Sequence, residues 1–389
     1  MSESNQADLE EFTAGTTTET VVQTVVLDLE TSQQKTERVR AGVEEFQAMA
    51  GYMADMMPSI PEWEWSPQNN TLYQMVTREF EDRTVKATTA REAAQHVAES
   101  FSSWRSRGKD GNRPQFGGGS YLVLSHQDFE LVENERGYGL KASFIPYKPV
   151  WFHIEPNGYQ RDYLERIFED DADTGSCELH VEPDGSVRAH LVVKWDVEVY
   201  EPADVTTTVG VDIGENVIYA AAVVDGDDVE DVVVEPGREF RHYRERLEDK
   251  RERLMEQGDL RGVRQTRGER ERYTEHVLNT ASREIVDLAS EHAPSTIALE
   301  ELTGYRETVA DPIHDWPYAK LQEMIAYKAK ATGVPIEMVD PENTSITCRK
   351  CGQTNREYRN GTEFSCSRCG YEIHADVNAA INIAQVEKT

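Results

Sequence analysis

Four cysteines in the last part of the 389-residue chain constrain its fold more than any other feature. Their spacing is C-x₂-C-x₁₄-C-x₂-C, which predicts two knuckles that close around one tetrahedral zinc ion. Four thiolates fill the coordination sphere, so we expect this Zn²⁺ to be structural rather than catalytic. A redox-active pair is the alternative. The four ligands are Cys348, Cys351, Cys366 and Cys369, and the fifth cysteine, Cys177, is expected to be a buried small hydrophobe.

The net charge of the chain is −31 at pH 7, from 41 Lys and Arg against 72 Asp and Glu. Such a surface normally repels phosphates and argues against a nucleic-acid partner. Only 12 of the 41 basic residues are Lys, however, and an acidic chain so poor in Lys resembles the proteins of salt-accumulating halophiles. The charge therefore predicts a halophilic, haloarchaeal origin and does not exclude nucleic acid.

Composition indicates a folded cytoplasmic protein. Hydrophobic residues make up 38% of the chain, which is enough for a core despite 29% charged residues. The sequence has no apolar run of roughly eighteen residues and no basic, apolar leader, so we expect neither a membrane partner nor secretion. Clustering of four cysteines in one metal motif fits a reducing cytosol.

The first half of the chain is rich in β-forming segments. Residues 1–19 are rich in Ser, Thr and Glu and are expected to be a disordered tail. Residues 20–30 and 120–202 contain short β-rich runs separated by turn residues, which predicts a small β-barrel or sandwich. Within this part, the sequence EPDGS at 182–186 predicts a hairpin turn.

A helical insertion, residues 31–119, is expected to interrupt these strands. Apolar residues recur at helical spacing in two segments of it. Thr89 followed by Glu92 predicts the capping box of a third helix. The Gly-rich stretch 104–120 then carries four basic residues and one acid, which indicates a flexible basic linker.

After residue 202 the sequence predicts two buried strands around a tight turn, a third strand, and a long polar helical region at 238–292. The first part of this region, 238–272, holds twelve basic and nine acidic residues, a local excess of positive charge. Two interpretations stay open: a solvated helical hairpin with Glu–Arg pairs, or arginines that face phosphate. The candidate phosphate ligands are Arg264, Arg267 and Arg270, joined on the cysteine motif by Arg349 and Lys350.

Three acids stand in apolar sequence. Asp212 ends one predicted strand, Glu300 and Glu301 end another, and Asp376 begins a predicted amphipathic helix. Buried carboxylates need a cation or a hydrogen-bonding network. Mg²⁺ prefers such hard oxygen ligands, and two Mg²⁺ ions can support phosphodiester cleavage. The order of strands and helices predicts that one carboxylate of each segment converges on such a site.

These motifs together resemble one family. The ordered set VGVDIGEN, IALEEL, TCRKCG, FSCSRCGY and ADVNAAINIA closely resembles the OrfB/TnpB proteins of insertion sequences, which are RNA-guided DNA endonucleases related to type V CRISPR effectors. The resemblance implies a RuvC-like catalytic triad at Asp212, Glu300 and Asp376, holding Mg²⁺. It also implies two partners, a guide RNA and a double-stranded DNA target.

The resemblance further implies an α/β nuclease core of the RNase H type, preceded by a wedge-like β-barrel domain whose helical insertion resembles a recognition lobe. The core would comprise residues 203–345, the inserted zinc ribbon 346–372 and the final helix 373–389. The chain departs from the family pattern at Glu363, where a basic residue is common, and at His374 and Ala375, where a further charged residue is often found. Neither departure affects the triad.

Two other functions compete with this one. A nuclease-inactive DNA-binding regulator or vestigial transposon protein could keep the same fold without cutting. An actin-like ATPase could also place DIG after a strand, but the sequence offers no convincing second phosphate loop and that function leaves the zinc ribbon unused.

Overall fold

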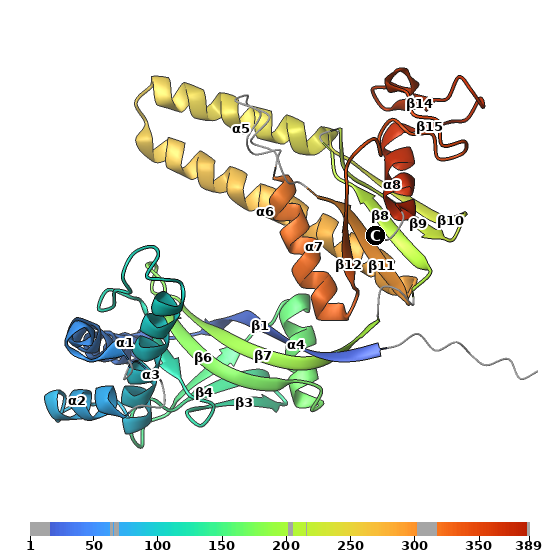
Figure 1. Ribbon diagram of the computed structural model, residues 1–389. Coiled ribbons are helices and arrows are strands. Elements are labelled where there is room, and N and C mark those ends of the chain that lie inside the picture. The colour runs from blue at the N-terminus through green and yellow to red at the C-terminus, as the bar shows by residue number, and fades with distance from the viewer. Residues whose placement is uncertain are drawn as a thin grey trace, which may run out of the picture. The chain divides into compact units, whose positions relative to one another are not determined.

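The computed structural model describes residues 16–62, 65, 70–200, 205–214, 216–301 and 317–386. They fold as two compact units (Figure 1). One unit is Thr20–Asp196, and the other contains the residues from Val197 on together with 16–19. Among the described residues, no helix has the length and apolar character needed to cross a membrane.

The first unit is built on a seven-stranded, mainly antiparallel sheet. Alternate residues of its strands are buried, as Val25, Leu27 and Leu29 are in β1. The sheet order is β2-β6-β7-β1-β5-β4-β3. The strands are β1 (Thr16–Glu30), β2 (Tyr121–Leu124), β3 (Phe129–Asn134), β4 (Gly137–Ala142), β5 (Val150–Ile154), β6 (Asp173–Val181) and β7 (Val187–Tyr200). Because β2 and β3 are the two edges, the ladder is open in the described residues, and the expected closed barrel is not confirmed.

Helices complete the first unit. Gly42 of α1 lies against the Phe144 ring and Leu122, where an added Cβ would come within 2.7 Å of the ring. The helices are α1 (Gln33–Met56), α2 (Thr71–Glu79), α3 (Ala87–Ser106) and α4 (Gly158–Phe168), with a 3₁₀ turn η1 (Met57–Ser59) after α1. The two helices predicted from apolar spacing correspond to α1 and α2.

Several expectations for this unit were wrong in detail. The third helix begins at Ala87, before Thr89, and Thr89 is fully buried inside it, so Thr89 and Glu92 form no capping box. Strand β1 begins at Thr16, so residues 16–19 are strand, while the rest of the expected tail lies outside the described residues. The expected linker from 104 is helical up to Ser106.

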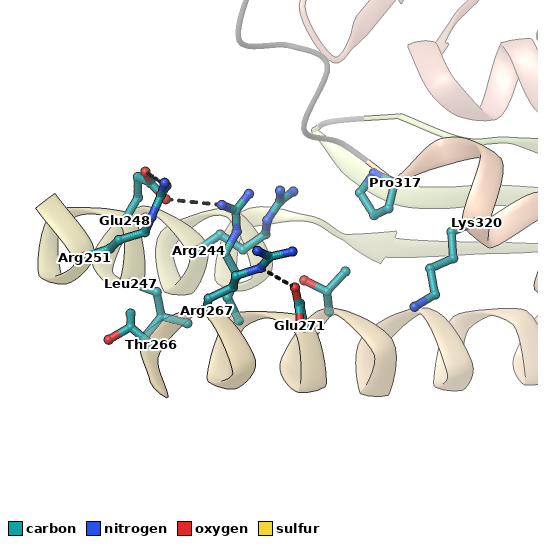
Figure 2. A pocket seen from close by; sticks show the side chains of 11 residues that line it. Arg244, Leu247, Glu248, Arg251, Thr266, Arg267, Glu271, Pro317 and Lys320 are labelled. Carbon is teal, nitrogen blue, oxygen red and sulfur yellow. Dashed lines mark hydrogen bonds and ion pairs between the residues drawn. The ribbon is translucent and has the colours of Figure 1, made fainter. Parts of the chain in front are cut away.

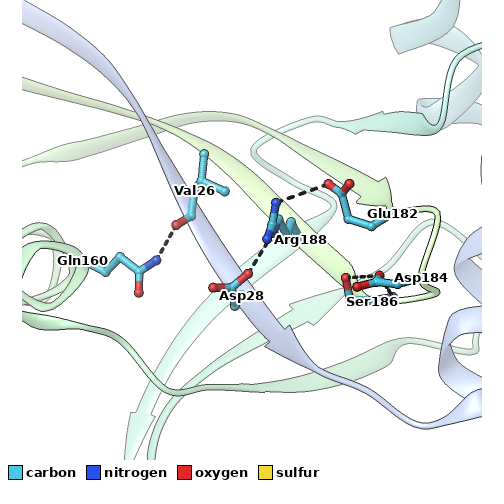
Figure 3. Close-up of polar contacts among 7 residues, drawn as sticks. All are labelled: Val26, Asp28, Gln160, Glu182, Asp184, Ser186 and Arg188. Carbon is cyan, nitrogen blue, oxygen red and sulfur yellow. Dashed lines mark hydrogen bonds and ion pairs between the residues drawn. The ribbon is translucent and has the colours of Figure 1, made fainter. Parts of the chain in front are cut away.

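Polar contacts join the elements of this unit (Figure 3). Gln160 of α4 donates a hydrogen bond of 2.6 Å from Nε2 to the carbonyl oxygen of Val26 in β1. Arg188 of β7 contacts Asp28 across the sheet at 2.9 Å. The predicted hairpin turn is present between β6 and β7, where Asp184 accepts hydrogen bonds from the backbone and hydroxyl of Ser186.

The second unit contains a five-stranded sheet of order β10-β9-β8-β11-β12. The three predicted strands are present as β8 (Thr207–Asp212), β9 (Val217–Asp225) and β10 (Asp228–Pro236), and they pair as antiparallel neighbours. Strand β11 (Ser295–Glu300) pairs in parallel with both β8 and β12 (Ile336–Val339). Parallel strands joined through helices are typically covered on both faces, and that is the arrangement here.

Helices cover the two faces of this sheet (Figure 1). Helices α6 (Leu260–Glu291) and α7 (Tyr318–Thr332) pack with one hydrophobic cluster, and α8 (Ala375–Gln385) packs with the other. The predicted helical region consists of two antiparallel helices, α5 (Arg238–Glu256) and α6. Between β12 and α8 the chain forms a small sheet of β13 (Arg359–Asn360), β14 (Glu363–Ser365) and β15 (Glu372–His374), after the short 3₁₀ turn η5 (Arg356–Tyr358).

Candidate active site and zinc site

The topology of the second unit brings Asp212 and Glu300 together at the carboxyl ends of two neighbouring strands. Asp212 ends β8 and Glu300 ends β11, and these strands run in parallel with Val211 opposite Leu299. Residues alternate between the two faces of a strand. Val211 and Leu299 belong to the cluster under α6 and α7, so Asp212 and Glu300 are on the opposite face, which α8 covers.

Gly210 sets the position of α8 on this face. A Cβ at Gly210 would lie 2.1 Å from the carbonyl oxygen of Ala380 and 2.5 Å from the nitrogen of Ala384, so the backbones of β8 and α8 touch here. Asp212 is two residues along the strand, about 6.6 Å away. Asp376 is one helical turn before Ala380, about 6 Å away. The matching offsets bring Asp376 to the level of Asp212.

Electrostatics also place the three carboxylates near one another. The pKa of Asp212 is raised from 3.8 to about 7, first because the group is buried and then because of the negative charges of Glu300 and Asp376. Arg359 acts in the opposite direction. Burial also raises the pKa of Glu300, against the hydrogen bond from Thr344 and the charge of Arg359.

Asp376 is 3% exposed and has one charged partner at short range. Arg359 Nη2 of β13 lies 2.5 Å from its Oδ1. Its other oxygen, Oδ2, is buried and accepts no hydrogen bond in the described part of the protein. His374 Nδ1 is 3.9 Å from that oxygen. A buried carboxylate oxygen of this kind has an uncompensated desolvation cost, which a cation would remove.

Glu300 and Glu301 differ in their surroundings. Glu300 is partly buried and accepts a hydrogen bond at Oε1 from the Thr344 hydroxyl. The side chain of Glu301 is exposed. Glu300 is therefore the acid of this pair that faces Asp212 and Asp376.

The donor set fits hard divalent cations. Three carboxylates, one with an oxygen free for a ligand, suit Mg²⁺, which binds through a few carboxylates and keeps several waters. Among the described residues, the carboxylates are not a group whose ligand atoms all lie within 4.8 Å of one another. Like charges repel one another, and Arg359 is a cation that offsets part of the charge of these acids. A cation would draw them together.

The four cysteines form the second site. Their sulfur atoms all lie within 4.8 Å of one another, and Cys348–Cys369 and Cys351–Cys366 are each 3.7 Å apart. Burial raises the pKa of Cys348 to about 12. At Cys366 burial also raises the pKa, but hydrogen bonds from the backbone N–H groups of Cys369 and Arg368, together with those of the Cys369 and Cys351 side chains, lower it to about 6. The structure thus brings together the predicted set, and its chemistry fits a closed Cys₄ zinc site.

The predicted nucleic-acid contacts are dispersed. Arg267 pairs with Glu271 at 2.8 Å and Arg270 with Glu248 at 3.2 Å, while Arg264 is exposed. On the cysteine motif, Lys350 is exposed and Arg349 donates a hydrogen bond to the carbonyl oxygen of Asp227. The solvated-hairpin interpretation expects such Glu–Arg pairs. The Arg267–Glu271 pair lies within α6, whereas the Arg270–Glu248 pair joins α6 to α5.

A cavity of about 440 Å³ lies between α5, α6 and the start of α7. Figure 2 shows Arg244 and Glu248 on α5 facing Arg267 on α6, with Lys320 at the other end. Five of the lining residues are cationic and two are acidic. The cationic residues are Arg244, Arg251, Arg267, Arg270 and Lys320.

Sequence reasoning missed residues that fix the site. Arg359 is one of several basic residues on the ribbon, and nothing in the sequence distinguishes it as the one that contacts Asp376. Asn378 and Asn382 of α8 donate hydrogen bonds of 2.8 and 2.7 Å to the carbonyl oxygen of Thr347, just before the first knuckle. Asn378 is fully buried. Two Asn residues one helical turn apart on an otherwise apolar helix were the available signal.

Comparisons with known proteins fit this arrangement. Residues 318–383 match the family model "Cas12f1-like, TNB domain". The chain is 33% identical over 163 residues to a CRISPR-associated endodeoxyribonuclease Cas12f1 of Sulfoacidibacillus thermotolerans, covering 38% of this chain and 39% of that protein. It is 23% identical over 261 residues to the TnpB-like protein MJ0751 of Methanocaldococcus jannaschii, covering 64% of this chain and 90% of that protein.

The aligned part spans less than half of the length of the first three Cas12f1 proteins that match, 39%, 24% and 42%. Among solved structures, a Cas12f1–sgRNA–target DNA complex matches with a TM-score of 0.63 at 15% identity, over 94% of this chain and 99% of that one. The mini-RNA-guided endonuclease CRISPR-Cas_phi3 matches with a TM-score of 0.60 at 10% identity, over 94% and 92%. These likenesses establish a shared mixed α/β fold.

Proposed function

We propose that this chain, a relative of the TnpB-like proteins and of the type V effectors, is an RNA-guided, Mg²⁺-dependent DNA endonuclease encoded by an insertion sequence. The observation that supports the proposal best is that Asp212 and Glu300 end two neighbouring parallel strands, and that α8, which contains Asp376, packs against β8. Relatives named as endodeoxyribonucleases support the same activity.

The architecture supports a RuvC-type, RNase H-like core. Strands β10, β9 and β8 are antiparallel neighbours, β11 and β12 complete the sheet in parallel with β8, and helices cover both faces. The zinc ribbon precedes α8 in the chain. We assign the core to 203–345 and 373–389, the ribbon to 346–372, the wedge-like domain to 20–30 and 120–202, and the recognition-like insertion to 31–119.

The proposed roles of the residues follow from their surroundings. Asp212, Glu300 and Asp376 hold the Mg²⁺ ions, and Thr344 orients the Glu300 carboxylate through its hydrogen bond. Bound Mg²⁺ supplies an acidified water and positive charge for the departing 3′ oxygen. Burial of Asp212 and Asp376 limits the access of bulk water, which would strengthen the attraction between their ionised carboxylates and Mg²⁺.

The zinc ribbon has a structural role in this proposal. Its four thiolates leave no open position for a substrate. The backbone nitrogen of Ala375 donates a 2.8 Å hydrogen bond to the carbonyl oxygen of Thr362, and Arg359 contacts Asp376. The ribbon therefore supports the start of α8, where the third acid lies.

We further propose that the partners are a guide RNA and double-stranded DNA. A relative in complex with sgRNA and target DNA supports this assignment, and so does the cationic cavity between α5, α6 and α7. Arg264, Arg267 and Arg270, with Arg349 and Lys350, are the proposed phosphate contacts. Sequence choice would rest mainly on base pairing with the guide.

Replacement of Asp212 tests the nuclease assignment. Asp212→Ala removes one carboxylate, so we expect Mg²⁺-dependent cutting of a matched target to be abolished while guide RNA binding is unchanged. Asp228→Ala, an exposed Asp of the same unit, is the control and should cut like the wild type. Undiminished cutting by Asp212→Ala would refute the triad. Failure of the wild type to cut would favour the nuclease-inactive regulator.

We also propose that the acidic surface is an adaptation to high salt. The expected result is greater stability in about 1 M KCl, where the Debye length is about 3 Å and self-repulsion is screened, than in dilute buffer. Refolding titrations in both solvents test it. Equal stability in the two would remove the halophilic interpretation.

A further inference from the structure

A cluster of two histidines and a glutamate lies in the first unit, whereas the carboxylates and cysteines already described belong to the second unit. It consists of Glu178 and His180 on β6 and His190 on β7. Glu178 and His190 are directly opposite each other in the ladder, and His180 is two residues from Glu178, on the same face. One ligand atom of each residue lies within 4.8 Å of the other two.

The geometry points to a site for a transition-metal ion, and we propose that Glu178, His180 and His190 bind Zn²⁺ there. Two imidazoles and one carboxylate are a common three-residue ligand set for zinc, with water completing a tetrahedral site. Imidazole ligands select zinc and its neighbours over Mg²⁺ or Ca²⁺. The site is independent of the proposed nuclease function.

The surroundings favour these ligands. Each of the three side chains is partly buried, so the ion would be only partly exposed to water. Arg188, the neighbour opposite His180, contacts Asp28 at 2.9 Å and Glu182 at 3.6 Å, so its charge is largely offset (Figure 3). Glu178 accepts from His180 Nε2 at 2.8 Å, and Zn²⁺ would replace the proton of that contact.

Binding requires a defined rearrangement. The rings of His180 and His190 are stacked with centroids 3.9 Å apart and an interplanar angle of 19°. A metal ion must lie in the plane of each imidazole that binds it, so at least one ring must turn out of the stack. His180 is also stacked on Tyr121, at 5.1 Å and 21°, which makes His190 the ring that turns. Rotation about χ2 of His is soft.

Zinc titration of the full-length protein tests the site. The protein is prepared with zinc in its Cys₄ site and titrated calorimetrically with Zn²⁺ in excess Mg²⁺, which occupies the carboxylate sites. We expect one further Zn²⁺ per chain. With Co²⁺ as a probe, the additional ion should give d–d bands without new thiolate charge transfer, since no cysteine is a ligand.

Variants identify the ligands. His190→Asn should remove the second binding event, and Glu178→Gln, which keeps the size of the side chain, should weaken it by at least about tenfold. His126→Ala, which removes an exposed histidine of the same unit, is the matched control and should bind like the wild type. Absence of a second zinc in the wild type, or unchanged binding in both ligand variants, would overturn the proposal.

Discussion

Gly210→Ala is a sharp test of how α8 brings the third acid into the site. The new Cβ would lie 2.1 Å from the Ala380 carbonyl oxygen and 2.5 Å from the Ala384 nitrogen, both backbone atoms. Contacts of this kind are not found below about 3 Å, so α8 must move by about 1 Å or more. Asp376 lies on the same helix, one turn away, and would move with it.

The expected effect is large on catalysis and moderate on stability. Misplacing a catalytic group by about 1 Å can lower a rate by about a hundredfold. Overpacking of this kind typically costs about 1–3 kcal/mol, or several degrees in Tm for a unit of this size. We therefore expect single-turnover cutting of a guide-matched DNA in Mg²⁺ to fall about a hundredfold, with the protein still folded at room temperature.

Gly214→Ala is the matched control. Its added Cβ would lie 3.5 Å from the Val217 carbonyl oxygen, which is ordinary contact, so cutting and Tm should stay close to those of the wild type. Thermal unfolding of all three proteins should be measured beside the cutting rates. A Gly210→Ala protein that cuts within about twofold of the wild type would refute the proposed role of the β8–α8 contact.

Four further predictions concern the carboxylate site and the zinc site. The pKa of Asp212 is about 7 without metal, and Mg²⁺ needs the ionised form. Apparent Mg²⁺ affinity, measured by thermal shift, should therefore rise about tenfold from pH 5 to pH 6 and level off above pH 7, and an unchanged affinity across this range would contradict the assignment. Without Mg²⁺, the free energy of unfolding should instead fall as pH rises. Because the pKa of Asp212 is higher in the folded state, its protonated form stabilises the fold at low pH, and this stabilisation is lost between about pH 4 and pH 7. Arg359→Ala should cost about 2 kcal/mol in Mg²⁺-free urea unfolding because it leaves the Asp376 charge unpaired, and Mg²⁺ should restore more stability to the variant than to the wild type. Protein stripped of zinc with a chelator, and then returned to buffer containing Mg²⁺ without the chelator, should not cut, since the ribbon supports the start of α8. Addition of Zn²⁺ in the presence of Mg²⁺ should restore cutting, and full activity of zinc-free protein in Mg²⁺, checked by metal analysis, would exclude this role.

The core of the second unit was predictable because its signals are local. Apolar runs that end in an acid predicted β8 and β11, and the apolar stripe after Asp376 predicted α8. These patterns depend only on residues near one another in sequence. The convergence of the cysteine sulfurs was predictable for the same reason. Two cysteines separated by two residues lie in one short turn, so the two sulfur atoms of each pair must be close together.

Other features depend on contacts that sequence spacing does not reveal. The pairing of Arg359 with Asp376 is made by a side chain of a ribbon without hydrophobic periodicity. Thr89 matched the capping-box pattern by chance, because the helix starts earlier and buries it. Helix α4 was missed among strands, although Asn157 and Gln160 form a true capping box at its start. Only two of its residues are buried, so it has a weak apolar stripe.

The contact of β8 with α8 has a consequence for folding. Asp212 and Asp376 are 164 residues apart in sequence, and the segment between them contains the other four strands of the sheet, the helical hairpin, α7 and the ribbon. Contacts between residues so distant form late, because a long loop must first be closed. Chains that are only partly folded therefore lack an assembled trio of acids, and under the proposed function they could cut DNA only once the fold is complete.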